Sequence, residues 1–189
     1  MDLYNLMKNR RSTRDFSTKD ISKVTLKKIL KSGFLSPSGI DQKPFIYIVV
    51  DDNKIKSEIR RLCEKSDKKY FEKSNNFFKE WIKNKKITFK KDLLEDAPYL
   101  IVVAGDTTKP YWLESTWISI SYILLAAENE GLATLTYTPG EFDFLYNLLD
   151  IPSDFKPVVI IPVGYAKNKI IKKADNSNAK IHYNRYNIQ

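Results

Sequence analysis

The chain has 189 residues with a net charge of +9, and 42% of its residues are hydrophobic and 29% charged, as in ordinary globular proteins. Its single cysteine excludes an internal disulfide and, with a single histidine, argues against a zinc or Cys–His catalytic site. No apolar run reaches the roughly 18 residues that cross a bilayer, and the start lacks an apolar signal region, so we expect a cytoplasmic protein without a membrane partner.

The first third of the chain predicts two helices and a strand. Residues 2–9 read as a short helix, and the spacing of Leu26 and Ile29 predicts a second helix that ends near Gly33. The turn residues of SPSGIDQKP then lead into FIYIVV (residues 45–50). This continuous apolar, β-branched run is typical of a strand buried on both faces.

Residues 54–91 are rich in lysine and helical in character. They contain fourteen Lys and Arg against five Asp and Glu, so this one segment carries the whole net charge of the chain. A basic surplus is a reason to consider nucleic-acid binding. Because the remaining residues are neutral overall, the surplus is a property of this segment and not of the fold.

The second half alternates strand and helix patterns. Residues 97–105 and 157–166 are apolar enough for buried strands, LATLTYTPG reads as a strand that enters a loop, and EFDFLYNLLDIP reads as a short helix. Residues 115–131 predict a helix that is apolar on nearly every side, which indicates burial by more than one neighbour and suggests a subunit interface. The pattern indicates one layered α/β or α+β domain over residues 1–189, with a polar tail from residue 167.

The segment KNRRSTRDFS places Arg10, Arg11, Ser12 and Arg14 close together. Guanidinium groups and a hydroxyl match phosphate oxygens with charge-assisted hydrogen bonds. Two other interpretations remain open on these residues alone. Arg10 and Arg11 complement the negative end of the first helix, or RRST is a kinase recognition site.

No set of side chains for acid–base or nucleophilic catalysis is recognisable. Cys63 lies in the lysine-rich helical segment and His182 in the polar tail, and both are expected to be inert. A phosphate-binding cluster, several buried strands and no catalytic set favour a protein whose chemistry comes from a bound cofactor.

Five segments in this order resemble the nitroreductase family: RRSTRDFS, SPSGIDQKPF, DAPYLIVVAG, LLAAENEGLATLTYTPGEFD and PVVIIPVGYA. The resemblance runs from about residue 4 to the tail and is weakest in 54–95. It implies an α+β, three-layer fold with a central mixed sheet flanked by helices, in an intertwined homodimer with FMN at the interface.

The resemblance also implies a reaction. An FMN-dependent oxidoreductase would pass hydride from NAD(P)H through flavin to a small electron-poor acceptor, such as a nitroaromatic, quinone or enone, in a ping-pong cycle. No side chain would be catalytic and no metal would be needed. The alternatives are a specialised flavin reaction on the same fold (dehydrogenation, dehalogenation or flavin processing), a flavin carrier, or a basic nucleic-acid-binding module.

By resemblance, the cofactor would be held by the early cluster at its phosphate, by the SPSG and TPG turns at its ring, and by basic groups of the tail. These candidates are Arg10, Arg11, Ser12, Arg14, Pro37, Ser38, Gly39, Asp41, Pro139, Gly140, Glu141, Lys172, Lys173 and Arg185. Backbone N–H groups of residues 138–141 are expected near the reactive flavin nitrogen.

The chain departs from the family pattern after the SPSG turn. Asp41 and Lys43 stand where the family commonly has amides, and an ionised carboxylate cannot donate a hydrogen bond. We hypothesise that Lys43 brings positive charge to the substrate pocket and stabilises the anionic reduced flavin.

Residues 54–95 correspond to the variable segment that covers the substrate pocket in this family. Phe77, Phe78 and Trp81 have helical spacing, and core packing is favoured over an aromatic lid. The surrounding lysines either attract NAD(P)H or form a solvated face.

Overall fold

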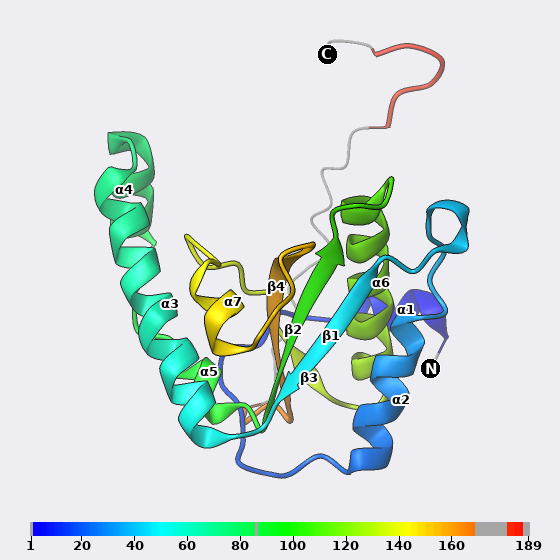
Figure 1. Cartoon of the computed structure of the whole chain (residues 1–189), viewed down its shortest axis with the longest axis horizontal. Helices are drawn as coiled ribbons and strands as arrows, with labels where there is room; N and C mark the ends of the chain where they lie inside the picture. The colour runs from blue at the N-terminus through cyan, green and yellow to red at the C-terminus, as the bar shows by residue number, and fades with distance from the viewer. Residues whose placement is uncertain (1, 86, 169–180, 187–189) are drawn as a thin grey trace.

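The computed structural model describes residues 2–85, 87–168 and 181–186. It has three layers, with one sheet between two groups of helices (Figure 1). The expected α+β nitroreductase-like fold is confirmed. Within the described residues, no helix combines the length and the apolar character needed to span a membrane.

The sheet has the strand order β1-β2-β4-β3, and all of these neighbours pair antiparallel. The strands are β1 (Phe45–Val50), β2 (Tyr99–Asp106), β3 (Ala133–Thr134) and β4 (Phe155–Gly164). We expected a mixed sheet. The strands pair only antiparallel with one another, and among the described residues the one parallel pairing is a single bridge between Ser12 and Thr134. The strand predicted in LATLTYTPG is shorter than expected, because the chain pairs at β3 and then again only at Tyr137, opposite Ile160.

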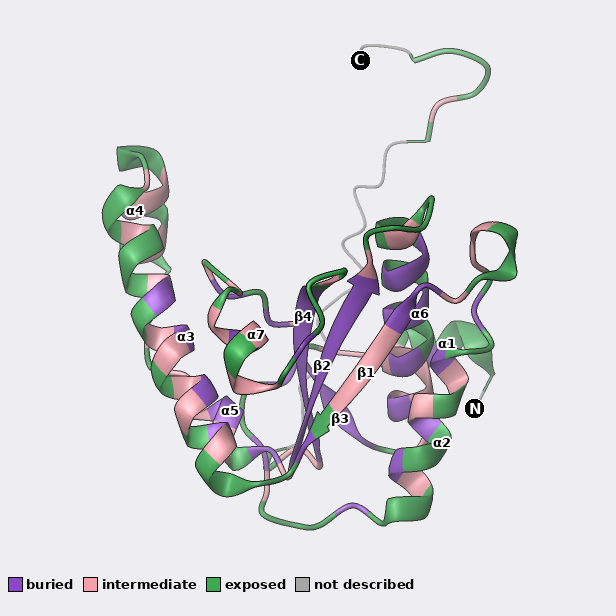
Figure 2. Ribbon diagram, viewed as in Figure 1, coloured by how far each residue is buried: buried purple, intermediate pink, exposed green. Residues whose placement is uncertain are grey.

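Helices cover both faces of the sheet (Figure 2). On one face lie α2 (Lys23–Gly33) and α6 (Trp112–Asn129), with the short α1 (Leu3–Asn9) against α6. On the other face lie α3 (Asn53–Lys73), α5 (Leu93–Asp96) and α7 (Phe144–Leu148). Strands β2 and β4 are buried because helices cover both faces and both edges are paired.

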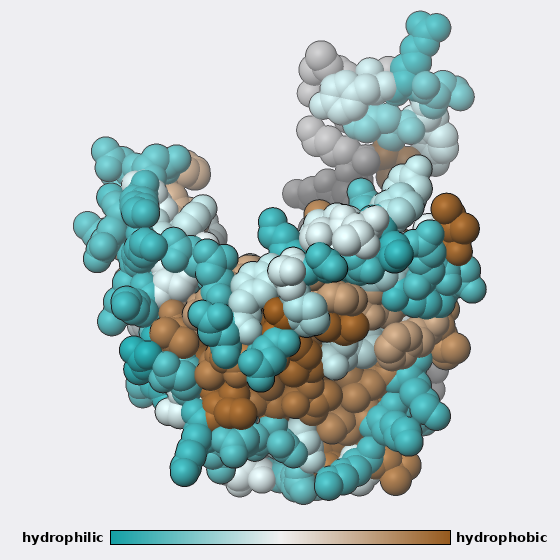
Figure 3. Space-filling view, in the orientation of Figure 1, coloured by the Kyte–Doolittle hydropathy of each residue, from teal (hydrophilic) through white to brown (hydrophobic). Residues whose placement is uncertain are grey.

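Strand β1 differs from its prediction. It is an edge strand, and the side chains of residues 46–49 are half-buried or exposed. Apolar side chains gather on this side of the molecule over β1 and β2, between α3 and α2 (Figure 3). The prediction of burial on both faces was wrong for this chain, because no described segment covers the free edge of β1.

Helix α4 (Asn76–Asn84) follows α3 almost directly and extends it beyond the sheet (Figure 1). Asn75 caps its start by accepting a hydrogen bond from the N–H of Phe78 at 2.9 Å. None of the residues of α4 is buried. We call α3 and α4 together the helical arm.

Candidate functional site

The Arg10–Arg14 segment is fixed to the sheet beside β3. The N–H of Thr13 donates to the carbonyl of Thr134 at 2.9 Å, and Ser12 forms the parallel bridge to the same residue. Thr134 lies four residues before Thr138, so the fold brings the arginine cluster to the TPG turn.

The three arginines of this segment have different surroundings. Arg11 donates to the carbonyls of Lys8 and Arg10 at 2.7 and 2.8 Å, so its guanidinium complements the end of α1, as the alternative interpretation expects. Within the described residues, the side chains of Arg10 and Arg14 form no hydrogen bond or ion pair. Burial raises the pKa of Glu128 on α6, and Arg10 and Arg11 oppose that shift.

Arg14 lines a cavity of about 470 Å³, which we call the anchor cavity. Its other lining residues come mostly from the TPG loop and from the segment between α4 and α5, with one residue each from α3 and α5, and include Thr136, Tyr137, Thr138 and Lys91. This volume lies within the range of small-molecule sites.

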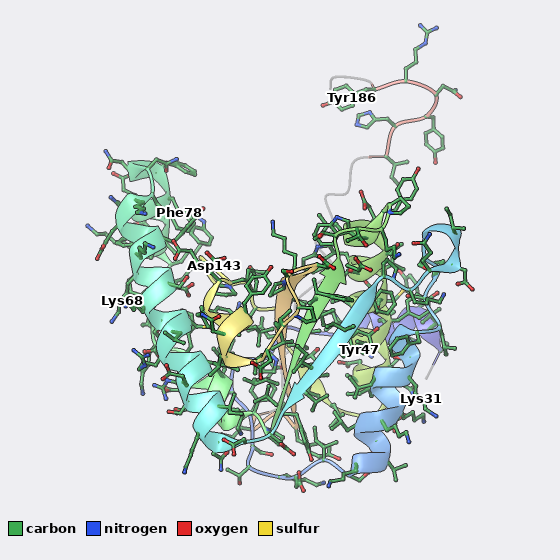
Figure 4. All side chains as sticks on the ribbon, viewed as in Figure 1. Lys31, Tyr47, Lys68, Phe78, Asp143 and Tyr186 are labelled. Atoms are coloured by element: carbon green, nitrogen blue, oxygen red, sulfur yellow. The ribbon has the colours of Figure 1, made fainter. Side chains whose placement is uncertain are left out.

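A second cavity of about 380 Å³ adjoins it, and we call it the aromatic pocket. Its apolar lining comes mainly from the helical arm and the segment that follows it: Tyr70, Phe71, Phe78, Ile82, Ile87 and Phe89. Phe78 lies on the side of α4 that faces the segment carrying Asp143 (Figure 4). The two cavities share Asp67, Ile87, Lys91 and Thr138, so these four residues, Thr138 among them, form the border between the cavities.

The TPG turn is held against α3. The N–H of Gly140 donates to Asp67 Oδ1 at 3.1 Å, and the N–H of Glu141 donates to Ser66 Oγ at 2.6 Å. Pro139 is buried and has no N–H. Two of the N–H groups expected near the flavin nitrogen, those of Gly140 and Glu141, therefore donate to α3. Of residues 138–141, this leaves the N–H of Thr138 as the candidate for that role.

The loop with Pro37, Ser38 and Gly39 lies on the other face of the sheet. The N–H of Gly39 donates to Ser115 Oγ of α6 at 3.2 Å, and Ser38 Oγ accepts from the N–H of Lys43 at 3.0 Å. None of residues 37–43 lines the anchor cavity or the aromatic pocket. Within a single chain, the SPSG turn therefore lies apart from the TPG turn.

Asp41 and Lys43 engage each other. Lys43 Nζ lies 2.5 Å from Asp41 Oδ1 and donates to the carbonyl of Ser36 at 2.6 Å. Ile40, Asp41 and Lys43 all have φ near +50°, a strained region for residues other than glycine. The Lys43 charge is thus partly compensated within its own loop.

The core-packing interpretation of the α4 aromatics is wrong. Phe77 is 79% exposed and Trp81 44% exposed, while Phe78 lines the aromatic pocket and stacks on Trp81 with ring centroids 5.9 Å apart. The reason is that α4 projects past the sheet, so among the described residues no further layer of helices or strands lies over α4.

The predicted tail residues are Lys172, Lys173 and Arg185. Lys172 and Lys173 lie outside the described residues. Arg185 is exposed, and its neighbour Tyr186 lies far from the sheet in Figure 4.

Ser66, Asp67, Lys91 and Tyr137 were not predicted as site residues. Asp67 accepts from Tyr137 Oη at 2.9 Å and lies 3.2 Å from Lys91 Nζ. Burial raises the pKa of Tyr137, and the negative charge of Asp67 adds to that shift. A separation of 70 residues between Asp67 and Tyr137 leaves no local sequence signal for this contact.

Comparison with known proteins places the chain in one family. The model of the nitroreductase family matches residues 7–165. The iodotyrosine deiodinase of Thermotoga neapolitana is 39% identical over 163 residues, which are 86% of this chain and 88% of that protein. A crystal structure of an oxidized iodotyrosine deiodinase bound to FMN and 3-iodo-L-tyrosine superposes with a TM-score of 0.91 at 36% identity, covering 98% of this chain and 100% of that one. An FMN-dependent nitroreductase from Clostridium difficile R20291 gives a TM-score of 0.76 at 26% identity, covering 97% and 99%. The chain belongs to the nitroreductase family.

Proposed function

We propose that the chain binds FMN and uses it for reductive dehalogenation of a halogenated phenol of the tyrosine class. The observation that carries the proposal is the pair of adjoining cavities in a chain 39% identical to an iodotyrosine deiodinase. One cavity is lined by Arg14, whose side chain has no partner among the described residues, and the other has an aromatic lining. Bound flavin would supply two electrons. With one proton, these replace the carbon–halogen bond by carbon–hydrogen and release halide.

The residues fit such a cofactor in two respects. Arg14 lines the anchor cavity and offers donors for a phosphate there, and Arg10 and Ser12 lie in the same segment, while Arg11 is already engaged at α1. Thr138 would meet the flavin ring at the border of the two cavities. The aromatic pocket then receives the substrate ring, and residues 54–95 act as the covering segment that the sequence predicts.

A homodimer completes this proposal. The SPSG turn lies on the α6 face, away from both cavities of its own chain. A second copy that packs through α6 would bring its Pro37–Asp41 loop to the first copy's flavin. The cytoplasmic location stays a prediction.

A second candidate follows from the likeness to the nitroreductase. In it, NAD(P)H reduces the flavin and a nitroaromatic, quinone or enone accepts the electrons. Lys85, which lines the anchor cavity, and the nearby Lys83 are exposed, and their charge favours an anionic donor such as NAD(P)H in either reaction.

The test has two steps. FMN affinity is measured by flavin fluorescence for wild type, Arg14→Ala, and the control Arg61→Ala, an exposed arginine paired with Glu58. Loss of a charge-assisted hydrogen bond costs about 1.5–3 kcal/mol, so Arg14→Ala is expected to weaken FMN binding roughly tenfold or more, and the control is not.

Reduced holoprotein is then mixed anaerobically with 3-iodo-L-tyrosine or with a nitroaromatic. Release of one iodide and one tyrosine per flavin supports dehalogenation. If the nitroaromatic oxidises the flavin and 3-iodo-L-tyrosine does not, the second candidate is favoured. A wild-type chain that binds no FMN contradicts both candidates.

A further inference from the structure

The positive charge of the chain lies on one side of the molecule. Residues 54–91 carry the whole surplus of nine charges, and they cover most of the helical arm and the segment that follows it, beside one face of the sheet (Figure 1). Such a distribution attracts a negatively charged partner to one side of a protein over long distances. An acidic partner therefore approaches this molecule from the side of the arm.

One side of α3 faces solvent. Positions 54, 58, 61, 65, 68 and 72 follow one another at intervals of four and three residues, so they lie along one face of the helix. The buried residues Ile59, Cys63 and Ser66 lie on the opposite face. The solvent face carries four basic and two acidic residues, which are Lys54, Arg61, Lys65 and Lys68, and Glu58 and Glu72. We call it the basic face of the arm.

Three lysines of the basic face keep their charge free for another molecule. Arg61 is paired with Glu58 at 2.6 Å. Lys54, Lys65 and Lys68 are exposed and form no ion pair among the residues that the structure describes. Lys65 and Lys68 also border a hollow of about 530 Å³ in the surface of α3. Acidic groups of a partner can pair with these lysines without displacing an existing ion pair.

The basic face points away from the two cavities. Lys65 and Lys68 line neither the anchor cavity nor the aromatic pocket, and Lys68 projects outward from α3 in Figure 4. A small donor such as NAD(P)H has to enter the cavities, because hydride passes only between groups in contact, so these two lysines do not touch it there. A second copy that packs through α6, on the other face of the sheet, would leave the basic face exposed.

The length of the basic face fits a protein partner. Helix α3 has 21 residues, which at 1.5 Å per residue make about 31 Å. A protein interface of standard size, about 800 Å² on each partner, is roughly 30 Å across. Phe77 of α4 is 79% exposed and lines neither cavity, so the arm also offers an aromatic side chain of the kind that is enriched in interfaces.

A single helix separates the basic face from the aromatic pocket. Asp67, Tyr70 and Phe71 of the same helix line that pocket. A helix with its side chains is about 10–12 Å wide. Electrons tunnel through protein over such a distance, whereas hydride does not. A carrier of single electrons on the basic face therefore needs no access to the cavities.

Resting on the function proposed above, we propose that the basic face docks an acidic electron-transfer protein, one that carries electrons on an iron–sulfur cluster or on a flavin. Two reduced carriers are each oxidised by one electron in a cycle. Their two electrons, with one proton, reduce the bound flavin by one hydride equivalent. The carrier is thus a source of electrons beside NAD(P)H.

The two glutamates of the basic face favour a protein over a nucleic acid. Duplex DNA carries one negative charge for about every 1.7 Å of its axis, so phosphates would lie close to both Glu58 and Glu72. A folded protein can place a basic residue opposite each glutamate and acidic residues opposite the lysines.

Two variants with the same change of charge test the docking site. Lys65→Glu/Lys68→Glu changes the basic face, and Lys27→Glu/Lys31→Glu is the matched control on two exposed lysines of α2, on the other face of the sheet (Figure 4). Each substitution lowers the net charge by two, so both variants go from +9 to +5. They differ only in where the charge is reversed.

Binding of an acidic two-iron ferredoxin and of an acidic flavodoxin is measured by titration calorimetry, with protein freed of FMN and with protein loaded with it. The wild type is expected to bind at least one carrier, with an affinity that falls as salt rises because exposed charges are screened. The variant of the basic face is expected to bind that carrier at least tenfold more weakly, because like charges then face one another, and the control less than twofold more weakly.

The second readout is reduction of FMN-loaded protein by the reduced carrier, followed anaerobically by flavin absorbance. At low salt its second-order rate is expected to fall about tenfold in the variant of the basic face and to stay near the wild-type rate in the control. Dithionite reduces flavin without docking, so its rate is expected to be the same in all three proteins.

Equal losses in both variants would assign the effect to net charge and overturn the docking site. Failure of both carriers to bind the wild type also overturns it, and duplex DNA that binds in their place would identify the basic face as a nucleic-acid surface. If the variant of the basic face does not fold, Lys65→Gln/Lys68→Gln and Lys27→Gln/Lys31→Gln repeat the comparison with smaller changes of charge.

The proposed function and the docking site can fail separately. Dithionite-reduced holoprotein that releases iodide from 3-iodo-L-tyrosine but binds no carrier supports the dehalogenation and overturns the docking site. Holoprotein that the carrier reduces but that leaves 3-iodo-L-tyrosine unchanged contradicts the substrate and supports the docking site. A wild-type chain that binds no FMN contradicts the proposed function, and the inference falls with it because the carrier then has no electron acceptor.

Discussion

Cys63 is fully buried in the core between α3 and the sheet, next to Tyr137. Burial raises the pKa of its thiol to about 12, and only the thiolate is a strong nucleophile. The fold thus keeps the only cysteine of the chain unreactive, although it lies one turn of α3 from Asp67.

Native protein at pH 8 is therefore expected to resist iodoacetamide for hours, and protein unfolded in urea is expected to react within minutes. Mass spectrometry of the Cys63 peptide measures both. Complete labelling of native protein would show that the thiol is accessible. The result matters for the assays above, since a reactive thiol would also reduce or trap electrophilic acceptors.

At the scale of elements, α3 depends on Arg60. Its guanidinium donates to Glu64 at 2.9 Å, lies 2.5 Å from Asp92 and also pairs with Glu95, which ties α3 to the start and end of α5. Hydrogen bonds from Ser57 and Arg60 lower the pKa of Glu95. For Glu64 burial acts in the opposite direction, but bonds from Lys91 and Arg60 outweigh it and the pKa is also lowered.

Carboxyl groups with a lowered pKa stabilise the fold above their unfolded pKa of about 4.3, and the contribution is lost as the pH falls through the lowered values. Arg60→Met is expected to reduce the free energy of unfolding by about 1 kcal/mol at pH 7, after allowance for solvent screening. The difference from wild type is expected to shrink below about pH 4. Urea titrations at pH 7 and pH 3 measure it, with Arg61→Met as the exposed control. An equal loss at both pH values would assign the effect to packing of the Arg60 chain.

At the scale of the whole molecule, α6 has apolar side chains both on the side that packs against the sheet and on its opposite, partly exposed side. Ser119, Ile120 and Ile123 are buried against the sheet, while Trp117 and Ile118 on the other side are 38% and 39% exposed. Such exposed apolar groups on a central helix are a candidate interface for the proposed homodimer, which stays a prediction.

Ile118→Asp is expected to convert a dimer into a monomer of 22.0 kDa, because it places a charge in the proposed interface. FMN affinity should fall with it, since the SPSG loop of the second copy is lost. Sedimentation and flavin fluorescence measure the two effects. Lys65→Asp on the exposed side of α3 controls for the change of charge. A wild-type chain that sediments as a monomer with bound FMN would contradict the interface.

Local patterns determined much of this molecule. The apolar runs at 45–50, 97–105 and 157–166 predicted strands because β-branched residues in series favour extended backbone, and KNRRSTRDFS predicted a cluster of anion-binding groups because those groups are neighbours in the chain. The family followed from five such segments in order.

Only the tertiary structure decided which groups meet. It assigned Arg11 to the end of α1 and left Arg14 to the anchor cavity, it moved the α4 aromatics out of the core, and it separated the SPSG turn from the TPG turn. It also joined Asp67 to Tyr137, Gly140 and Lys91. Apart from the bonds of Arg11 to Lys8 and Arg10, which are local in the sequence, the physical reason is the same in each case. Hydrogen bonds and burial between residues tens of positions apart depend on how helices pack on the sheet, and a local pattern carries no information on that distance.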